Sequence, residues 1–368
     1  MRILQIIDSL PATSGGARFV SELTLTLTAK NVNCDLLLID GNESHFFNDL
    51  RSANVKIIVL DSSVKNRYRF NYVRKIAQLM GKYDIIHVHI FPASYLVALA
   101  SLFTKKFIVF TEHNAYNRRA VHPIFKFAEK FIYSRFIKVV GISPAVLTFV
   151  DQHLKINKGK MVLIENGVNL NAITSSKAAK RLNFSLSESD IVLLMSARFA
   201  DQKDQMTLIK ALSDLPADFK LLFAGDGPNL DKCMLYAQES GVFSRINFLG
   251  ARSDVYEIIQ MSDINILSSH YEGFGLSAVE AMAAAKPVVA TNVPGVAEVV
   301  DDAGLLFEVG DVQRLKALIL KLGQEKEFYH EIAMRCLERS KLYDIENMTE
   351  KYLQLYKEIY INNYGTGE

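Results

Sequence analysis

One stretch of the sequence, residues 264–287, constrains the fold of this chain more than any other. It begins with the apolar run INIL, which is typical of a buried strand. A loop with two glycines, Gly273 and Gly275, leads into a run of helix formers that stops at Pro287. A strand, a glycine loop and a helix N-terminus in this order present unpaired backbone N–H groups and the positive end of a helix dipole to an anion.

Two glutamates lie in this stretch, Glu272 just before the expected helix and Glu280 in its first turns. An anion site does not need two acids beside it, so their expected role is to accept hydrogen bonds from hydroxyl groups, as on a ribose or a sugar. The stretch therefore predicts a site for a phosphate attached to hydroxyl-rich groups. The alternative is a glycine loop that serves packing alone.

The run EGFGLSAVEAMA, followed by PVVAT and then by Glu298, resembles the signature of retaining glycosyltransferase family 4, of the type found in bacterial surface-polysaccharide synthesis. The family often has glycines where this chain has Ala285 and Pro294, so the match departs in detail there. The resemblance implies the α/β GT-B fold, in which two Rossmann-like domains face each other across a deep cleft.

The same resemblance divides the chain. Residues 1–168 are expected to form an acceptor-side domain and residues 169–347 a nucleotide-sugar-binding domain, with a C-terminal helix at 348–362 packing back onto the first. A length of 368 residues suits two domains of ordinary size. Apolar runs that alternate with helical patterns, as at 34–39 and 55–60, independently favour parallel α/β sheets.

A pair of cations follows the expected strand at 190–197. Arg198 and Lys203 lie between this strand and the helix expected at 205–212, where they form a natural clamp for a diphosphate. The family has both cations at this spacing, usually after a glycine where this chain has Ala197. The alternative is a solvated loop in which the cations pair with neighbouring aspartates.

Further site residues come from the resemblance alone. The backbone around Arg252 is expected to hold the nucleobase, and Gly16 of the pair Gly15-Gly16 is expected to approach the donor diphosphate. His113, at the C-terminal end of the strand expected at 107–113, corresponds to the family's active-site histidine. Ligands of open α/β sheets bind at such strand ends. His87 and His89 point the same way on another strand and are interpreted as structural or acceptor-side groups.

Charge is distributed unevenly along the chain. Residues 1–170 hold 22 basic and 12 acidic side chains, whereas the remainder holds 20 and 28. Residues 64–138 alone supply 14 basic groups and three acids, interleaved with aromatic side chains. This stretch, with Arg118, Arg119 and the nearby Gly15 loop, predicts an acceptor or membrane side that meets an anionic inner membrane or a lipid diphosphate. The alternatives are a core-packed helix with a solvated basic side, and charge complementarity between the two domains.

The expected compartment is the cytoplasm, with a peripheral position on the inner face of the cell membrane. The three cysteines (Cys34, Cys233 and Cys336) are far apart in sequence and are not spaced like disulfide partners or metal ligands. The sequence starts directly with an expected strand, so no signal peptide is expected. The longest apolar run, near 95–103, is too short to span a bilayer. No nucleic-acid-binding module is recognised despite the basic half.

The resemblance implies a retaining glycosyltransferase that uses a nucleoside diphosphate sugar, with UDP-sugar expected on frequency, and a glycan or polyprenyl-diphosphate-linked acceptor. Glu280 is expected to bind the ribose and Glu272 the sugar hydroxyls, while His113 faces the sugar. The cations and the N–H groups near Phe274, Gly275 and Leu276 are expected to neutralise the diphosphate. No Asp-x-Asp pair is present, so neither a metal nor another cofactor is expected.

Two alternatives stay open. A UDP-sugar 2-epimerase of the same fold would need several first-domain carboxylates around the sugar, and only Asp84 and Glu112 lie near expected strand ends. A nucleotide-sugar-binding subunit without catalysis would not need both glutamates, both cations and the histidine.

Overall fold

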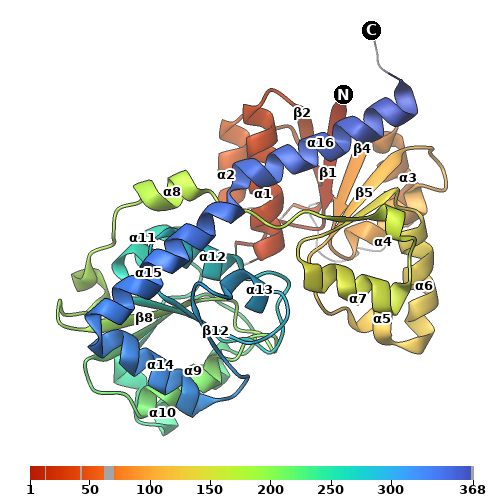
Figure 1. Cartoon of the computed structure of the whole chain (residues 1–368). Helices are drawn as coiled ribbons and strands as arrows, with labels where there is room; N and C mark the ends of the chain where they lie inside the picture. Colours follow the sequence, from red (N-terminus) through yellow and green to blue (C-terminus); the bar gives the residue numbers. More distant parts are fainter. Residues whose placement is uncertain (13, 42–43, 62–69, 366–368) are drawn as a thin grey trace. The chain divides into compact units, whose positions relative to one another are not determined.

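The computed structural model describes residues 1–12, 14–41, 44–61 and 70–365 (Figure 1). The chain divides into two compact units, Met1–Gly167 with Ile345–Glu368, and Val168–Asp344. It therefore passes between the units twice, after Gly167 and after Asp344, close to residues 168 and 347 where the sequence suggested the boundaries. Each unit is a parallel sheet covered by helices, as expected for two Rossmann-like domains.

Unit 1 contains a seven-stranded sheet in the order β3-β2-β1-β4-β5-β6-β7. Every pairing between these strands is parallel. The strand order reverses between β1 and β4, and such a reversal opens a crevice outside the carboxyl ends of the two strands. The strands are β1 (Arg2–Ile7), β2 (Asn33–Asp40), β3 (Ile57–Asp61), β4 (Ile85–His89), β5 (Phe107–Glu112), β6 (Lys138–Gly141) and β7 (Met161–Leu163).

Unit 2 repeats this plan with six parallel strands in the order β10-β9-β8-β11-β12-β13. Its order reverses between β8 and β11, so its crevice lies outside the ends of those two strands. The strands are β8 (Ile191–Ser196), β9 (Phe219–Ala224), β10 (Ile246–Phe248), β11 (Ile264–Leu267), β12 (Val288–Thr291) and β13 (Leu305–Phe307). The helices are α8 (Leu170–Ser175), α9 (Gln205–Ser213), α10 (Leu230–Glu239), α11 (Val255–Met261), α12 (Leu276–Ala283), α13 (Ala297–Val300), α14 (Val312–Gln324) and α15 (Lys326–Ser340).

The core of unit 1 follows the two-residue period of its strands. Along β1, Ile3 and Ile7 join the buried cluster on one face of the sheet, whereas Leu4 and Ile6 join the cluster on the other. The first cluster holds side chains of α1, α2 and α16, and the second those of α3, α4, α6 and α7. These helices are α1 (Gly15–Ala29), α2 (His45–Ser52), α3 (Phe70–Met80), α4 (Ala93–Ala100), α6 (Pro123–Ser134), α7 (Pro144–Leu154) and α16 (Ile345–Tyr364), with the short α5 (Arg118–Val121) between β5 and α6.

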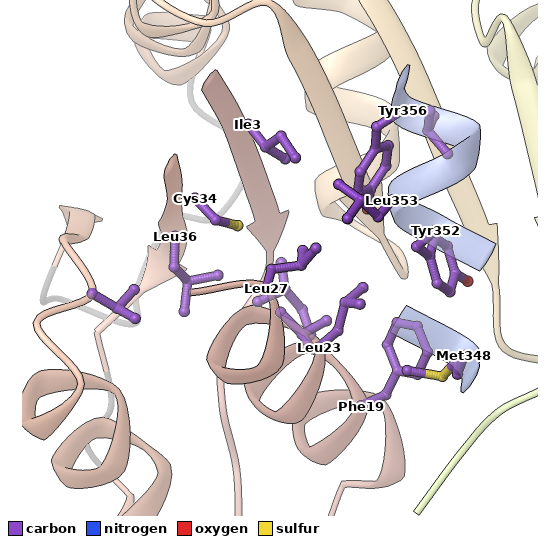
Figure 2. Packing of buried hydrophobic residues seen from close by; sticks show 14 of the residues in the cluster. Ile3, Phe19, Leu23, Leu27, Cys34, Leu36, Met348, Tyr352, Leu353 and Tyr356 are labelled. Atoms are coloured by element: carbon purple, nitrogen blue, oxygen red, sulfur yellow. The ribbon is translucent and has the colours of Figure 1, made fainter. Parts of the chain in front are cut away.

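Helix α16 brings the end of the chain back into unit 1. It lies along α1 and includes the expected helix at 348–362 (Figure 1). Figure 2 shows its buried side chain Tyr352 near Phe19 of α1, with Tyr356 further along the same helix. A short 3-10 turn at Lys341–Tyr343 separates α15 from α16.

Helix α6 differs from one interpretation of the basic, aromatic stretch at 64–138. Residues 64–69 lie outside the described part of the chain. Helix α6 buries Glu129, Ile132 and Tyr133, while its exposed face carries the apolar side chains of Ile124 and Phe127. The alternative of a core-packed helix with a solvated basic side is therefore wrong for α6, because the solvated side is largely apolar. Within the described residues, no helix is both long and apolar enough to cross a membrane.

Candidate active site

The crevice of unit 2 brings together two motifs that lie far apart in sequence. The loop after β8 carries Lys203, and the loop after β11 carries Glu272. An isolated antiparallel bridge joins Lys203 to Ser269. The backbone N–H of His270 donates to the carbonyl of Gln202 at 2.8 Å. Local backbone pairing thus holds both loops at the carboxyl edge of the sheet.

Glu272 is the centre of this arrangement and is only 6% exposed. Its Oε1 accepts from the ammonium of Lys203 and, at 2.9 Å, from the hydroxyl of Ser269, while its Oε2 accepts from the amide of Gln202 at 3.4 Å. Gln202 and Ser269 were not among the predicted site residues, although both lie inside the quoted motifs. Lys203 and Glu272 therefore form one buried ion pair.

The neighbouring aspartates do not neutralise the cations. Asp204 caps α9, accepting from the backbone N–H of Thr207 at 3.1 Å, and Asp201 accepts from Asn229 at 2.9 Å. The predicted alternative of a solvated loop in which Lys203 pairs with Asp201 or Asp204 is thus wrong. The side chain of Arg198 is exposed at the start of the same loop.

Helix α12 begins at the N-cap residue Gly275, which has a φ of +91°. A Cβ there would lie 2.9 Å from Val296, so both the conformation and the space require glycine. The ring of Phe274 is buried edge-on against Tyr343, with centroids 5.2 Å apart, so only its backbone is available to a ligand. The first N–H groups of α12, at Gly275 and Leu276, have no acceptor within the helix, as anion binding requires. Glu280 lies on the same helix and is 1% exposed.

Two further turns frame this crevice. A Cβ at Gly225 would lie 2.0 Å from the carbonyl oxygen of Ala197, so the turn after β9 packs directly on the loop of Arg198. Gly225 also donates its N–H to the carbonyl of Gly250 at 2.8 Å. The guanidinium of Arg252 binds Asp254 at 2.8 and 2.5 Å, which raises the pKa of Arg252. Its predicted contribution is through the backbone and stays a prediction.

The crevice of unit 1 lies between the end of β4 and the start of α1. Gly15 and Gly16 are the first two residues of α1, and the hydroxyl of Ser14 caps the helix at 3.3 Å from the N–H of Ala17. A Cβ at Gly16 would lie 2.4 Å from the side chain of Ile90, which follows β4. Glycine at this position therefore permits the close approach of α1 to β4.

His113 follows β5 at the same edge of the sheet. Its Nε2 lies 3.3 Å from Nδ1 of His89, and its ring packs edge-on against Phe19 at 4.8 Å. Burial lowers the pKa of His113 to about 3, so the ring is neutral near neutral pH. The structure thus links His113 to the buried His89, a contact that the sequence did not predict.

The two arginines assigned to the acceptor side differ. Arg119 donates to Glu129 at 3.0 Å, and its guanidinium lies 3.9 Å from the centre of the Phe91 ring. It therefore serves the packing of unit 1, whereas Arg118 is exposed. Glu112 is also engaged internally, because it accepts from the hydroxyl of Tyr133 and from the backbone N–H of Asn114.

Among the described residues, no group of three or more histidine, cysteine, aspartate or glutamate side chains is arranged to hold a metal ion. The chain has two doubly wound units. One of them carries cations and a helix that begins at a glycine, both at the reversal of its strand order. This combination is that of GT-B proteins, which bind nucleotide-linked substrates.

The comparisons with known proteins agree with this class. Residues 13–172 match the model of Glycosyltransferase Family 4, and residues 176–338 match the model of glycosyl transferases group 1. The chain belongs to the glycosyltransferases of family 4, with the GT-B fold. The crystal structure of the Anabaena protein HepE with UDP and glucose matches with a TM-score of 0.86 and 21% identity, over 97% of this chain and 100% of that one.

The curated relatives match this chain over different shares of their own length. N-acetyl-α-D-glucosaminyl L-malate synthase of Bacillus anthracis is 32% identical over 181 residues, 48% of this chain and 47% of the relative. The UDP-Gal:α-D-GlcNAc-diphosphoundecaprenol α-1,3-galactosyltransferase of Escherichia coli is 24% identical over 344 residues, 88% of this chain and 86% of the relative. The first matches thus span only about half of the relatives' length.

Proposed function

We propose that this protein is a retaining glycosyltransferase that moves a sugar from a nucleoside diphosphate sugar, with UDP-sugar preferred, to a polyprenyl-diphosphate-linked or other glycan acceptor in bacterial surface-polysaccharide synthesis. The observation that carries the proposal is the convergence at the strand reversal of unit 2. Lys203, Glu272 and the start of α12 meet there through bonded loops. Sequences related to this chain support the choice of chemistry.

The donor and acceptor classes rest on relatives. The E. coli relative is named for a UDP-linked sugar and a diphosphoundecaprenol-linked acceptor. A Campylobacter jejuni relative, 28% identical over 249 residues, is named for transfer to a diphospho-undecaprenol-linked sugar. The solved structure of HepE contains UDP and glucose. These names concern other proteins, and they favour the same classes for this chain.

In the proposed reaction, the bond between the sugar and the diphosphate breaks, and negative charge builds on the leaving diphosphate. Arg198, Lys203 and the first N–H groups of α12 stabilise that charge without a metal. Glu272 holds the ammonium of Lys203 in place and orients sugar hydroxyls, and Glu280 accepts from the ribose. No side chain is assigned as a covalent nucleophile. A hydroxyl of the acceptor forms the new bond to the anomeric carbon on the face that the diphosphate leaves, and the leaving phosphate takes up the proton of that hydroxyl.

The epimerase alternative is weakened by the two first-domain carboxylates that it would use. Asp84 precedes β4 and accepts from the backbone N–H of Arg2 at 2.7 Å, which places it at the edge of the sheet opposite to the strand ends. Glu112 is 4% exposed and bonded internally. The binding-subunit alternative would use the same donor contacts, so turnover is what distinguishes it.

The test is release of free nucleoside diphosphate from UDP-, GDP- and ADP-sugars, with and without a polyprenyl-diphosphate-linked acceptor. We expect acceptor-dependent release from one donor, with loss of at least a hundredfold in Lys203→Ala. Lys232→Ala, the same change on the exposed face of α10, is the matched control. Sugar interconversion without an acceptor would establish the epimerase, and tight donor binding without turnover on any acceptor would establish the binding subunit.

We further propose that unit 1 makes peripheral contact with an anionic membrane through α6. Ile124, Phe127 and Phe131 follow helical spacing on its exposed face, and the first two are 77% and 82% exposed. Lys126 and Lys130 lie beside them on the same helix. An exposed apolar stripe flanked by lysines is the pattern of a helix that lies in the interface of anionic lipids.

Vesicle flotation tests this contact. The wild type is expected to float with vesicles of phosphatidylcholine and phosphatidylglycerol and much less with phosphatidylcholine alone. The double variant Ile124→Ser/Phe127→Ser should lose this binding. Leu235→Ser, which removes an apolar side chain that is 56% exposed on α10 of unit 2, should not. Equal flotation of the double variant and the wild type would refute the role of α6.

A further inference from the structure

Helices α4 and α6 lie side by side in the layer that covers one face of the sheet of unit 1 (Figure 1). The hydroxyl of Tyr95 on α4 donates to Glu129 on α6. Further along, the guanidinium of Arg135 at the end of α6 donates to the hydroxyl of Ser101 at the end of α4 at 3.0 Å. Because the two contacts are equally far apart on both helices, the helices run in the same direction and the residues between the contacts lie at matching levels.

The exposed side of this helix pair is apolar. Leu99 and Phe131 lie between the two contacts, and both are exposed. Leu102 and Phe103, directly after α4, are exposed as well. These side chains extend the apolar stripe of α6, which contains Phe127, across to α4. An exposed apolar surface of this extent marks a contact with a membrane, a protein or a ligand.

A cavity of about 480 Å³ opens where this surface meets α3. Most of its lining is apolar, and the few polar groups come from an arginine, a glutamine and a threonine. Both the volume and this kind of lining are typical of a site for a small ligand. The cavity is lined on one side by Arg74, Ala77, Gln78 and Gly81, which share one face of α3 and its end, and on the other by Phe103 and Thr104 in the loop after α4.

The charge around the cavity is positive. Residues 70–111 carry five basic side chains and one acid, Asp84, whose carboxylate accepts from the backbone N–H of Arg2 at 2.7 Å. Arg74 is exposed, and no carboxylate of the described residues pairs with it. A guanidinium beside an apolar cavity is complementary to an amphiphile that has an alkyl chain and an anionic phosphate.

We propose that this cavity binds one anionic phospholipid of the membrane, with an acyl chain against Ala77 and Phe103 and the phosphate on the guanidinium of Arg74. The choice of a membrane lipid rests on the proposed contact of α6, because Phe103 belongs both to the cavity and to the apolar surface that continues to α6. A soluble phosphorylated compound would leave the apolar lining unused. The bound lipid adds a contact with one head group at a defined position, whereas exposed lysines respond to the net charge of the membrane surface.

Short-chain lipids test the cavity without a membrane. Dihexanoyl-phosphatidylglycerol and dihexanoyl-phosphatidylcholine are titrated below their micelle concentrations, and the methyl signals of Ala77 and Thr104 are followed by NMR. We expect saturable shifts of both signals with the anionic lipid, and weaker binding of the lipid whose phosphate is neutralised by choline. Absence of saturable shifts with the anionic lipid, or equal affinity for the two lipids, would overturn the proposal.

Two matched pairs of variants locate the site. Ala77→Phe fills the cavity, whereas Ala128→Phe makes the same change on the exposed face of α6. Arg74→Gln and Lys75→Gln each remove one exposed charge from α3, and of these two residues only Arg74 lines the cavity. We expect Ala77→Phe to abolish the saturable shift of Thr104, and Arg74→Gln to weaken binding about tenfold, as the loss of one charge-assisted hydrogen bond implies. Both control variants should bind like the wild type.

Retained binding in Ala77→Phe, or equal effects of Arg74→Gln and Lys75→Gln, would overturn the proposal. Because Arg74→Gln changes only an exposed side chain, it keeps the test decisive if Ala77→Phe lowers the melting temperature.

The double variant Ile124→Ser/Phe127→Ser separates this site from the contact of α6. It should lose flotation with vesicles that contain phosphatidylglycerol, yet keep the shifts of Ala77 and Thr104 with the monomeric lipid. Loss of these shifts in the double variant would place the lipid on α6 and overturn the proposal. A wild type that shows the shifts but does not float would instead refute the contact of α6 and still support a lipid site in the cavity.

Discussion

Unit 1 should lose stability in mild acid because of the histidines buried in its core. His87 and His89 are fully buried, and burial holds their pKa values well below the ordinary 6.5. In the unfolded chain, both rings take up a proton as the pH falls below about 6.5, while in the folded protein they stay neutral. The unfolded state then binds more protons, so the free energy of unfolding decreases as the pH falls and is unaffected well above pH 6.5.

The size of this effect follows from proton linkage. At a pH about one unit below the unfolded pKa, each ring that stays neutral in the fold costs about 1.4 kcal/mol. His87 and His89 together should lower the free energy of unfolding by about 3 kcal/mol between pH of roughly 8 and 5.5. That is a large share of the free energy of unfolding of a typical domain, which is about 5–15 kcal/mol. The pKa of His113 is lowered as well, but its side chain is only half-buried, so its contribution is left out of this sum.

Urea unfolding at the two pH values measures the loss, with hydrogen exchange of β1 and β4 peptides assigning the transition to unit 1. His87→Gln is the informative variant, because an amide can still donate to Thr111 and accept from Tyr356 but does not titrate. It should remove about half of the pH dependence, whereas the exposed His122→Gln should retain it. Equal stability of the wild type at both pH values, or an unchanged slope in His87→Gln, would refute the reasoning.

Three substitutions in unit 2 test the geometry of its crevice. Ala285 has a φ of +54° directly after α12, so Ala285→Gly should stabilise the protein by about 0.5–1 kcal/mol, and a lower melting temperature would contradict this. Gly295 has a φ of +96°, and a Cβ there would lie 2.3 Å from the carbonyl oxygen of Glu272, so Gly295→Ala should cost about 1–3 kcal/mol in chemical denaturation and weaken donor binding. Lys203→Met leaves the carboxylate of Glu272 buried without its cation and should lower the free energy of unfolding by about 2 kcal/mol. The double variant with Glu272→Met should largely recover this loss, and no recovery would show that the pair is not buried as described.

Local sequence signals were sufficient for much of unit 2. The strand at 264–267 begins and ends where the sequence predicted. Short apolar runs, glycines and a terminating proline act over a few residues, so no tertiary information is needed to place such elements. The left-handed φ of Ala285 also explains why the family often has glycine at this position. The sequence showed that this chain departs from the family here, but it did not show the reason.

Side-chain partners were not predictable in the same way. Periodicity indicates that Lys203 and Glu272 follow strands, but nothing local says that β8 and β11 are neighbours, which is what places the two charges together. The amphipathic pattern near α6 likewise indicated two faces. Which face is solvated depends on the elements that pack against the helix, and there the structure overturned the alternative of a solvated basic side.

A set of buried, hydrogen-bonded polar side chains in unit 1 shows the limit most clearly: Gln5, His87, His89 and Thr111 on the sheet, with Tyr352 and Tyr356 on α16. Gln5 and Tyr356 are bonded to each other although they lie at opposite ends of the chain. A fully buried amide or imidazole costs free energy unless each of its donors and acceptors finds a partner. An apolar row would pack as well without that condition, so the polar groups are not explained by packing alone. Tyrosine supplies both an apolar ring for the core and one hydroxyl that can accept from Gln5 and donate to His87. The last helix of the chain thereby completes the hydrogen bonds of the first strand, a pairing that no local pattern predicts.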